Sequence, residues 1–142
     1  ASRPYPDTAR NITKALTYKP ELVMLSFPSN SIAANYSDDE IMNNYKVLTH
    51  QLDSAKVKYI IFGTQPRDFA DANQRMRLKT LNDKIVAKYS YHVNDILEQL
   101  STPTYTIKSA YEAGDGIHLN NAGHAVILNA TLNHPIFMNV TQ

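Results

Sequence analysis

The 142-residue chain contains no cysteine, only four glycines and almost no excess of charge of one sign. Without cysteine there are no disulfide bonds, no thiolate nucleophile and no cysteine-ligated metal. The 14 basic and 13 acidic residues leave a net charge of +1. This balance argues against nucleic acid or an anionic membrane surface as the main partner. No stretch approaches the apolar length of a transmembrane helix.

The composition is that of a folded domain. Hydrophobic residues make up 43% of the chain and charged residues 19%, which is typical of a globular protein. We therefore expect residues 1–142 to form a single domain with one core. The chain begins at Ala1 without a methionine, so we expect a processed or trimmed product and leave the compartment open, secreted or periplasmic included.

Helical and strand patterns alternate along the chain. Two short apolar runs, 22–27 and 57–62, lack the polar alternation of a half-exposed strand, which is typical of strands buried on both faces of a parallel sheet. Segment 91–97 predicts a short strand that turns into a helix. Ser37 and Glu40 form a capping box at the start of a helix. Apolar residues at helical spacing predict helices over residues 4–18, 37–54, 71–88 and 120–132.

This order predicts an α/β fold, a flavodoxin-like three-layer α/β/α domain in which strands 22–27 and 57–62 are parallel neighbours. The loops 28–36, 63–70 and 111–120 should then meet at the carboxyl end of the sheet, where such folds bind ligands. Ser26 should be packed inside its strand, and Met76, Leu81 and Ile85 should face the core. Three strands alone would leave a bare sheet edge, which natural proteins avoid.

A carboxylate and an imidazole sit three residues apart in Asp115-Gly116-Ile117-His118. Gly114 and Gly116 allow the backbone to turn sharply there. We expect the Asp115 carboxylate to take the Nδ1 proton of His118 and to leave Nε2 free to accept a proton. A helix should follow, capped by Asn120 or its neighbour. Alone, this spacing also fits an ordinary surface charge pair.

The longer string 115–124, which ends in Asn-Asn-Ala-Gly-His, resembles the last sequence block of the SGNH, or GDSL-type, hydrolases. The resemblance implies that Asp115 and His118 are two members of a Ser-His-Asp triad. It also matches Asn30, in Pro28-Ser29-Asn30-Ser31, to the family's asparagine that donates to the oxyanion, although proline and serine replace the flanking glycine and aspartate. Read without the family, Asn30 fits a loop residue whose side chain caps a turn.

The nucleophile block of that family is absent. No Gly-Asp-Ser string occurs, and the first glycine of the chain is Gly63. The resemblance therefore implies the C-terminal portion of an SGNH hydrolase-like domain, lacking its first strand or two, which an N-terminal segment or a partner chain would complete. Ser29 and Ser31 are the only serines in this chain that we expect near the triad loops as replacements for the missing nucleophile.

Other polar residues of these loops are candidates for substrate binding, namely Ser29, Gln65 and Arg67. Arg67 would hold an anionic group of the substrate or pair with Asp68 or Asp71 at the surface. A metal site built from Asp115, His118 and His124 lacks a fourth ligand, so we expect no metal and no cofactor.

The resemblance implies an ester hydrolase that acts on a small ester, an acylated carbohydrate or a small lipid. His118 would act as general base and then acid, Asp115 would orient it, and Asn30 would stabilise the oxyanion. The alternative is a non-catalytic flavodoxin-like binding module that retains a relic acid–base pair.

Overall fold

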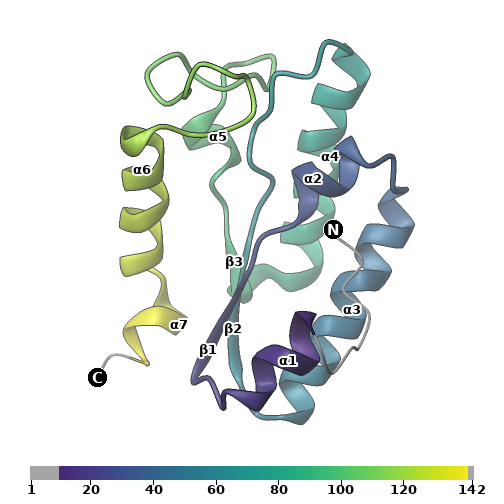
Figure 1. Ribbon diagram of the computed structural model, residues 1–142, viewed down its shortest axis with the longest axis vertical. Coiled ribbons are helices and arrows are strands. Elements are labelled where there is room, and N and C mark those ends of the chain that lie inside the picture. The colour runs from purple at the N-terminus through teal and green to yellow at the C-terminus, as the bar shows by residue number, and fades with distance from the viewer. Residues whose placement is uncertain (1–9, 141–142) are drawn as a thin grey trace.

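Figure 1 shows the computed structural model, which describes residues 10–140. Its sheet has three parallel strands in the order β1 (Leu22–Leu25), β2 (Lys58–Phe62) and β3 (Val93–Asn94). The helical segments are α1 (Asn11–Thr17), α2 (Pro28–Ala33), α3 (Asp38–Ser54), α4 (Ala72–Tyr89), the 3₁₀ turn η1 (Ser90–His92), α5 (Leu97–Leu100), α6 (Asn121–Leu132) and α7 (Pro135–Met138). The predicted helix 4–18 is seen as α1, and its residues 4–9 lie outside the described part.

Helices cover the sheet on both sides, which confirms the predicted three-layer α/β/α architecture (Figure 1). One core lies between the sheet and helices α1 to α4, and it contains Tyr45, Leu81 and Ile61. A second core lies on the side of α5 and α6 and contains Phe62 and Leu119. No helix within residues 10–140 is long and apolar enough to cross a membrane.

The strand pairing follows the prediction. β1 and β2 are parallel neighbours, with Leu22 beside Lys58 and Leu25 beside Ile61. The helix between them, α3, begins as predicted at Ser37, whose Oγ accepts a hydrogen bond from the Glu40 N–H at 3.1 Å. Its apolar stripe is buried and consists of Ile41, Tyr45, Leu48 and Leu52. This buried stripe packs α3 against the sheet and carries the chain back to start a parallel strand.

The segment after β1 differs from the prediction. The expected loop at 28–31 is the start of helix α2, because Pro28 stands at the first helical position, where its fixed φ and missing N–H cost nothing. The strand ends at Leu25, so Ser26 lies beyond it and is exposed rather than packed. Ser31 is buried on α2, and its hydroxyl donates to the Phe27 carbonyl at 3.2 Å.

Two methionines also lie elsewhere than predicted. Met24 of β1 is 50% exposed, so the face of the sheet from which its side chain projects is not fully covered at this strand. Burial on both faces was therefore a wrong prediction for this strand. Met76 is 54% exposed on the solvent side of α4, whereas Leu81 and Ile85 of the same helix are buried as predicted.

A buried polar network fixes the turn that follows β2. The fully buried Thr64 donates its hydroxyl to the Leu78 carbonyl at 2.8 Å and its N–H to Asn82 Oδ1 at 2.9 Å. Asn82 Nδ2 in turn donates to Asp95 Oδ1 at 3.1 Å. A side chain at Gly63 would collide with Asn82 Oδ1, so only glycine lets the strand pass this close to α4. The network sets the direction of residues 65–67.

Thr64→Val should lower the free energy of unfolding by about 1–2 kcal/mol, because it removes a hydroxyl that satisfies the buried Leu78 carbonyl. The matched control is Thr80→Val, which removes an exposed hydroxyl from α4 and should change stability by at most about 0.5 kcal/mol. Urea unfolding of both variants measures the difference. Equal destabilisation by the two changes would contradict a specific role for the network.

Candidate functional site

The Asp-x-x-His string lies in a tight loop between Glu112 and Leu119, which form an antiparallel bridge at its base. Gly114 and Gly116 have φ angles of 105° and 67°, a region that residues with a side chain rarely adopt. The sharp turn predicted at these glycines is therefore formed. Glu112 Oε1 accepts hydrogen bonds from both glycine N–H groups, at 2.7 and 2.6 Å. A carboxylate that the sequence analysis did not single out thus holds the turn in shape.

Asp115 and His118 make the predicted contact. Asp115 Oδ2 lies 2.6 Å from His118 Nδ1, while Oδ1 accepts the backbone N–H groups of Ile117 and His118, each at 2.8 Å. An ionised carboxylate only accepts hydrogen bonds, so the ring proton sits on Nδ1 and the lone pair on Nε2. The ring is therefore held in the tautomer that a general base needs.

These contacts stabilise the charged form of Asp115. The pKa of its carboxyl is held well below the ordinary range, first by the His118 backbone N–H, then by the His118 ring and the Ile117 N–H. Both side chains are open to solvent, with 73% of His118 and 47% of Asp115 exposed. The imidazole is thus oriented but uncovered.

Two residues from the loop after β2, Gln65 and Asp68, hold the Asp-x-x-His loop in place. Gln65 Nε2 donates to the Ile117 carbonyl at 2.9 Å, and the Asp68 N–H donates to the Gly116 carbonyl at 2.8 Å. Asp68 Oδ1 also accepts the Ile107 N–H at 2.7 Å. The sequence analysis gave Asp68 no such role, because nothing local in the sequence reveals a contact across 39 residues.

The residues that follow His118 anchor the loop from the other side. Asn120 caps α6 by accepting the Gly123 N–H at 3.0 Å, and its Nδ2 donates to the carbonyls of Ala110 and Glu112. A side chain at Gly123 would press against Leu119 and the Tyr111 carbonyl. Asn120 and Gly123 of the string therefore have a structural reason.

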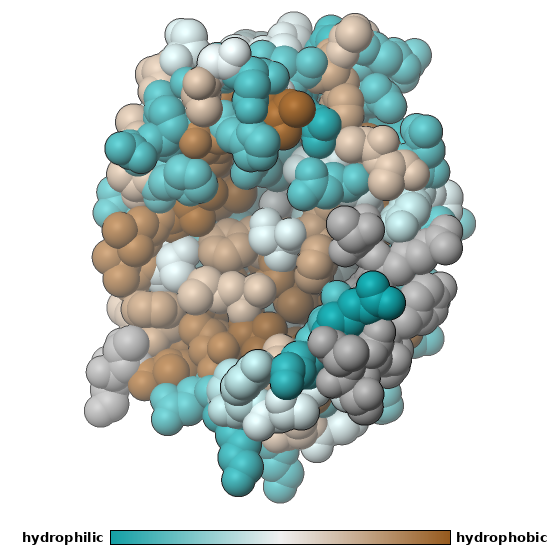
Figure 2. Space-filling view, in the orientation of Figure 1, coloured by the Kyte–Doolittle hydropathy of each residue, from teal (hydrophilic) through white to brown (hydrophobic). Residues whose placement is uncertain are grey.

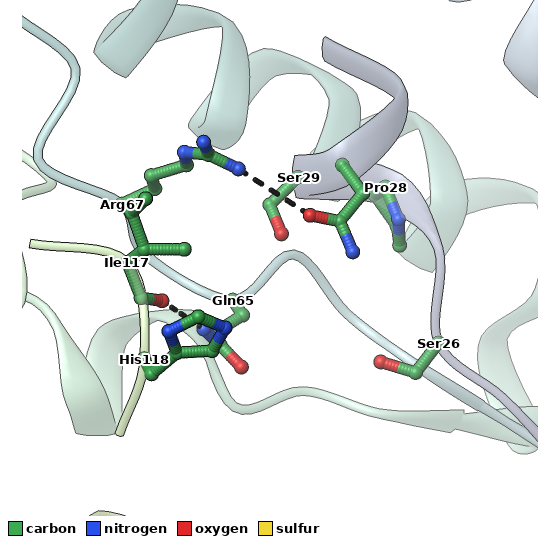
Figure 3. Close-up of a pocket in the computed structure, with 8 residues that line it drawn as sticks. Ser26, Pro28, Ser29, Gln65, Arg67, Ile117 and His118 are labelled. Atoms are coloured by element: carbon green, nitrogen blue, oxygen red, sulfur yellow. Dashed lines mark hydrogen bonds between the residues drawn. The ribbon is translucent and has the colours of Figure 1, made fainter. Parts of the chain in front are cut away.

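The predicted site residues meet at one pocket of about 110 Å³ at the carboxyl end of β1 and β2 (Figure 3). Asn30 and His118 both line it, as predicted, while Asp115 contacts the His118 ring. The full lining consists of Ser26, Pro28, Ser29, Asn30, Gln65, Arg67, Ile117 and His118.

Arg67 determines which way the Asn30 amide faces. The guanidinium donates from Nη1 to Asn30 Oδ1 at 3.3 Å, as the dashed line in Figure 3 shows. Because arginine only donates, the amide oxygen faces Arg67 and the Nδ2 donors face away from it. The amide is thereby turned so that its donors remain available.

The serines of this region make no hydrogen bond to His118 in the described chain. Ser26 lies on the opposite side of the pocket from His118 (Figure 3), and Ser29 also lines the pocket. Ser31 is engaged with the Phe27 carbonyl and does not line it. No group of three metal-ligating side chains comes together within residues 10–140, so His124 does not join Asp115 and His118 in a metal site.

Comparisons with known proteins identify relatives through the fold rather than the sequence. No family model matches the chain, and no curated protein sequence resembles it significantly. A candidate acylhydrolase of Bacteroides fragilis superimposes with a TM-score of 0.76 at 20% identity, over 90% of this chain and 66% of that one. A GDSL-like lipase of Bacteroides thetaiotaomicron gives 0.78 at 17%, over 91% and 66%.

This chain has the fold of GDSL-like hydrolases. It spans 66% of the length of the two bacterial proteins. The OSK domain of Drosophila Oskar has a similar fold, with a TM-score of 0.68 at 14% identity, over 80% of this chain and 61% of that one. At such identities the likeness establishes the fold, and the chemistry has to be argued from the pocket.

The pKa of Asp115 should fall well below the ordinary value of about 3.9 in an NMR titration of its side-chain carboxyl carbon. His118→Ala should raise this pKa, while the two backbone N–H bonds keep it below the ordinary value. Because the folded value is the lower one, these contacts stabilise the loop above about pH 4, and their contribution is lost as the pH falls toward the folded value. An ordinary pKa in the unmodified chain would contradict the described contacts.

Proposed function

We propose that this chain carries the acid–base and oxyanion groups of a GDSL-type ester hydrolase, and that it acts with a serine from outside residues 1–142. The observation that carries the proposal is the meeting of His118, oriented by Asp115, with Asn30 at one pocket. The likeness to a candidate acylhydrolase and to a GDSL-like lipase supports it. The substrate is a small ester or an acylated carbohydrate.

The reaction uses each group at a defined atom. His118 Nε2 takes the proton from the serine hydroxyl as its oxygen attacks the ester carbonyl, and Asp115 stabilises the imidazolium that forms. Asn30 Nδ2 donates to the oxyanion of the tetrahedral intermediate. His118 then gives the proton to the departing alcohol, and water repeats the sequence to release the acid. Ser29, Gln65 and Arg67 line the pocket and bind the substrate, and no cofactor takes part.

The unpaired outer edge of β1 in the described chain is an argument for a further segment that completes the sheet. No strand of the described chain pairs with this edge, and Met24 beside it is 50% exposed. Leu128 and Leu132 of α6 are also 56% and 47% exposed, and apolar side chains gather over α6 and α7 on this face of the molecule (Figure 2). A strand added in parallel to β1 would end at the carboxyl end of the sheet, beside the pocket. We propose that an N-terminal segment or a partner chain supplies both this strand and the serine.

The chain alone should hydrolyse p-nitrophenyl acetate at a negligible rate, and activity should appear when a segment that bears Gly-Asp-Ser is present. Loss of the nucleophile costs about as much as loss of the whole triad, on the order of 10⁶ in turnover. The controls are Ser26→Ala, Ser29→Ala, Ser31→Ala and His118→Ala. Robust turnover by the chain alone that one serine change abolishes would place the nucleophile in this chain. If the completed protein stays inactive and is not labelled by a fluorophosphonate, the chain is a binding module.

In the completed, active protein, Asn30→Ala should lower kcat by about 10²–10³, because one oxyanion donor is lost in the transition state. KM should change much less, since the ground-state carbonyl carries little charge. The matched control is Asn43→Ala, which removes an exposed amide from α3 and should leave kcat unchanged. Steady-state kinetics of both variants provide the measurement, and an unchanged kcat in Asn30→Ala would refute the oxyanion role.

A further inference from the structure

Arg67 is a half-buried cation in the candidate pocket that has no acidic partner in the described chain. Its contacts are the hydrogen bond to Asn30 Oδ1 and the stacking of the guanidinium 5.2 Å from the centre of the Phe69 ring. The acidic residues nearest in sequence are engaged elsewhere, because Asp68 Oδ1 accepts the Ile107 N–H and Asp71 Oδ1 accepts the Asn73 N–H. The predicted surface ion pair with Asp68 or Asp71 is therefore not formed.

Three other basic side chains of this protein pair with carboxylates. Arg77 and Lys84 share the Asp38 carboxylate, at 2.8 and 2.9 Å, and Lys79 pairs with Asp83 at 2.6 Å. Arg67 instead lines the pocket among uncharged side chains and His118, where its guanidinium is suited to bind an anion.

The hydrogen bond to Asn30 uses only one of the N–H donors of the guanidinium in the described chain. Arginine carries five N–H donors in a planar fork that matches the two oxygens of a carboxylate or phosphate, and one of them reaches the amide oxygen. The rest of the lining is uncharged or belongs to His118. The Asp115 carboxylate does not line the pocket and is bound to the His118 ring. The pocket thus favours negative charge at the end where Arg67 lies.

We propose, building on the function above, that the ester substrate carries a second, negatively charged group, a carboxylate or a phosphate. Arg67 binds this group beside the ester. Arg67 is a specificity-determining residue in this scheme and takes no part in bond making or breaking. The pocket volume of about 110 Å³ lies below the roughly 300–1,000 Å³ of sites for larger ligands. This size suits a short charged group.

The test is an anion titration of the isotope-labelled chain, followed by NMR at constant ionic strength. Inorganic phosphate and acetate are added separately, with chloride as the reference anion. The signals to follow are the Arg67 Nε–H, the Asn30 side-chain amide and the backbone amide of Gln65. Phosphate or acetate should produce saturable shifts at these groups, and the tighter of the two identifies the preferred anion.

Three variants decide the assignment. Arg67→Gln should weaken binding about tenfold or more, because it removes the charge while it keeps a donor for Asn30, whereas Arg67→Lys should retain part of the affinity. Lys46→Gln removes the same charge from an exposed position on α3 and should have no effect. Absence of saturable shifts, or equal affinity in Arg67→Gln, would overturn the proposal.

The outcome separates this inference from the proposed function. His118→Asn should leave anion binding intact, since the binding group is Arg67, although it removes the proposed general base. If the titration fails, the anion site is refuted, but the pocket can still hydrolyse neutral esters and the proposed function stands. Saturable binding in a completed protein that hydrolyses no ester would instead support the anion site and refute the enzyme.

Discussion

The candidate site depends on one carboxylate that accepts three hydrogen bonds from its own loop. Asp115 accepts the backbone N–H groups of Ile117 and His118 on one oxygen and the His118 ring on the other. The same group therefore closes the turn, stays ionised and selects the ring tautomer. Replacing it with a neutral side chain of equal size would disturb all three properties together. This explains why two glycines with positive φ and the Glu112 carboxylate are arranged around it.

The parallel sheet supplies the other half of the site. β1 and β2 end at the same edge, so α2 brings Asn30, and the turn after β2 brings Gln65 and Arg67, to the side of His118. The buried network of Thr64, Asn82 and Asp95 holds that turn against α4. The pocket is thus built from three segments that meet only because the strands run in one direction.

The features that local chemistry encodes were predictable from the sequence. The capped helix α3, the two principal strands and the Asp115–His118 contact each depend on residues a few positions apart. The position of Asn30 followed from the strand order and from the family resemblance.

Some of the failures concern contacts between distant segments. Met24 is exposed because no segment of the described chain covers it on its face of the sheet, which no local pattern records. Ser26 is exposed because the strand ends at Leu25. The supporting role of Asp68 joins residues 39 positions apart.

The two halves of the site differ in the length of chain that each contact closes. The bond between Asp115 and His118 spans three residues, whereas the contacts of Arg67 with Asn30 and of Gln65 with Ile117 span 37 and 52. The entropy lost in closing a loop grows with its length, so the Asp115–His118 contact costs less of it than the contacts that bring Asn30, Arg67 and Gln65 to the pocket. The Asp115–His118 contact is thus set mainly by residues of its own loop, whereas the alignment of Asn30 with it requires β1, β2 and the segments that follow them.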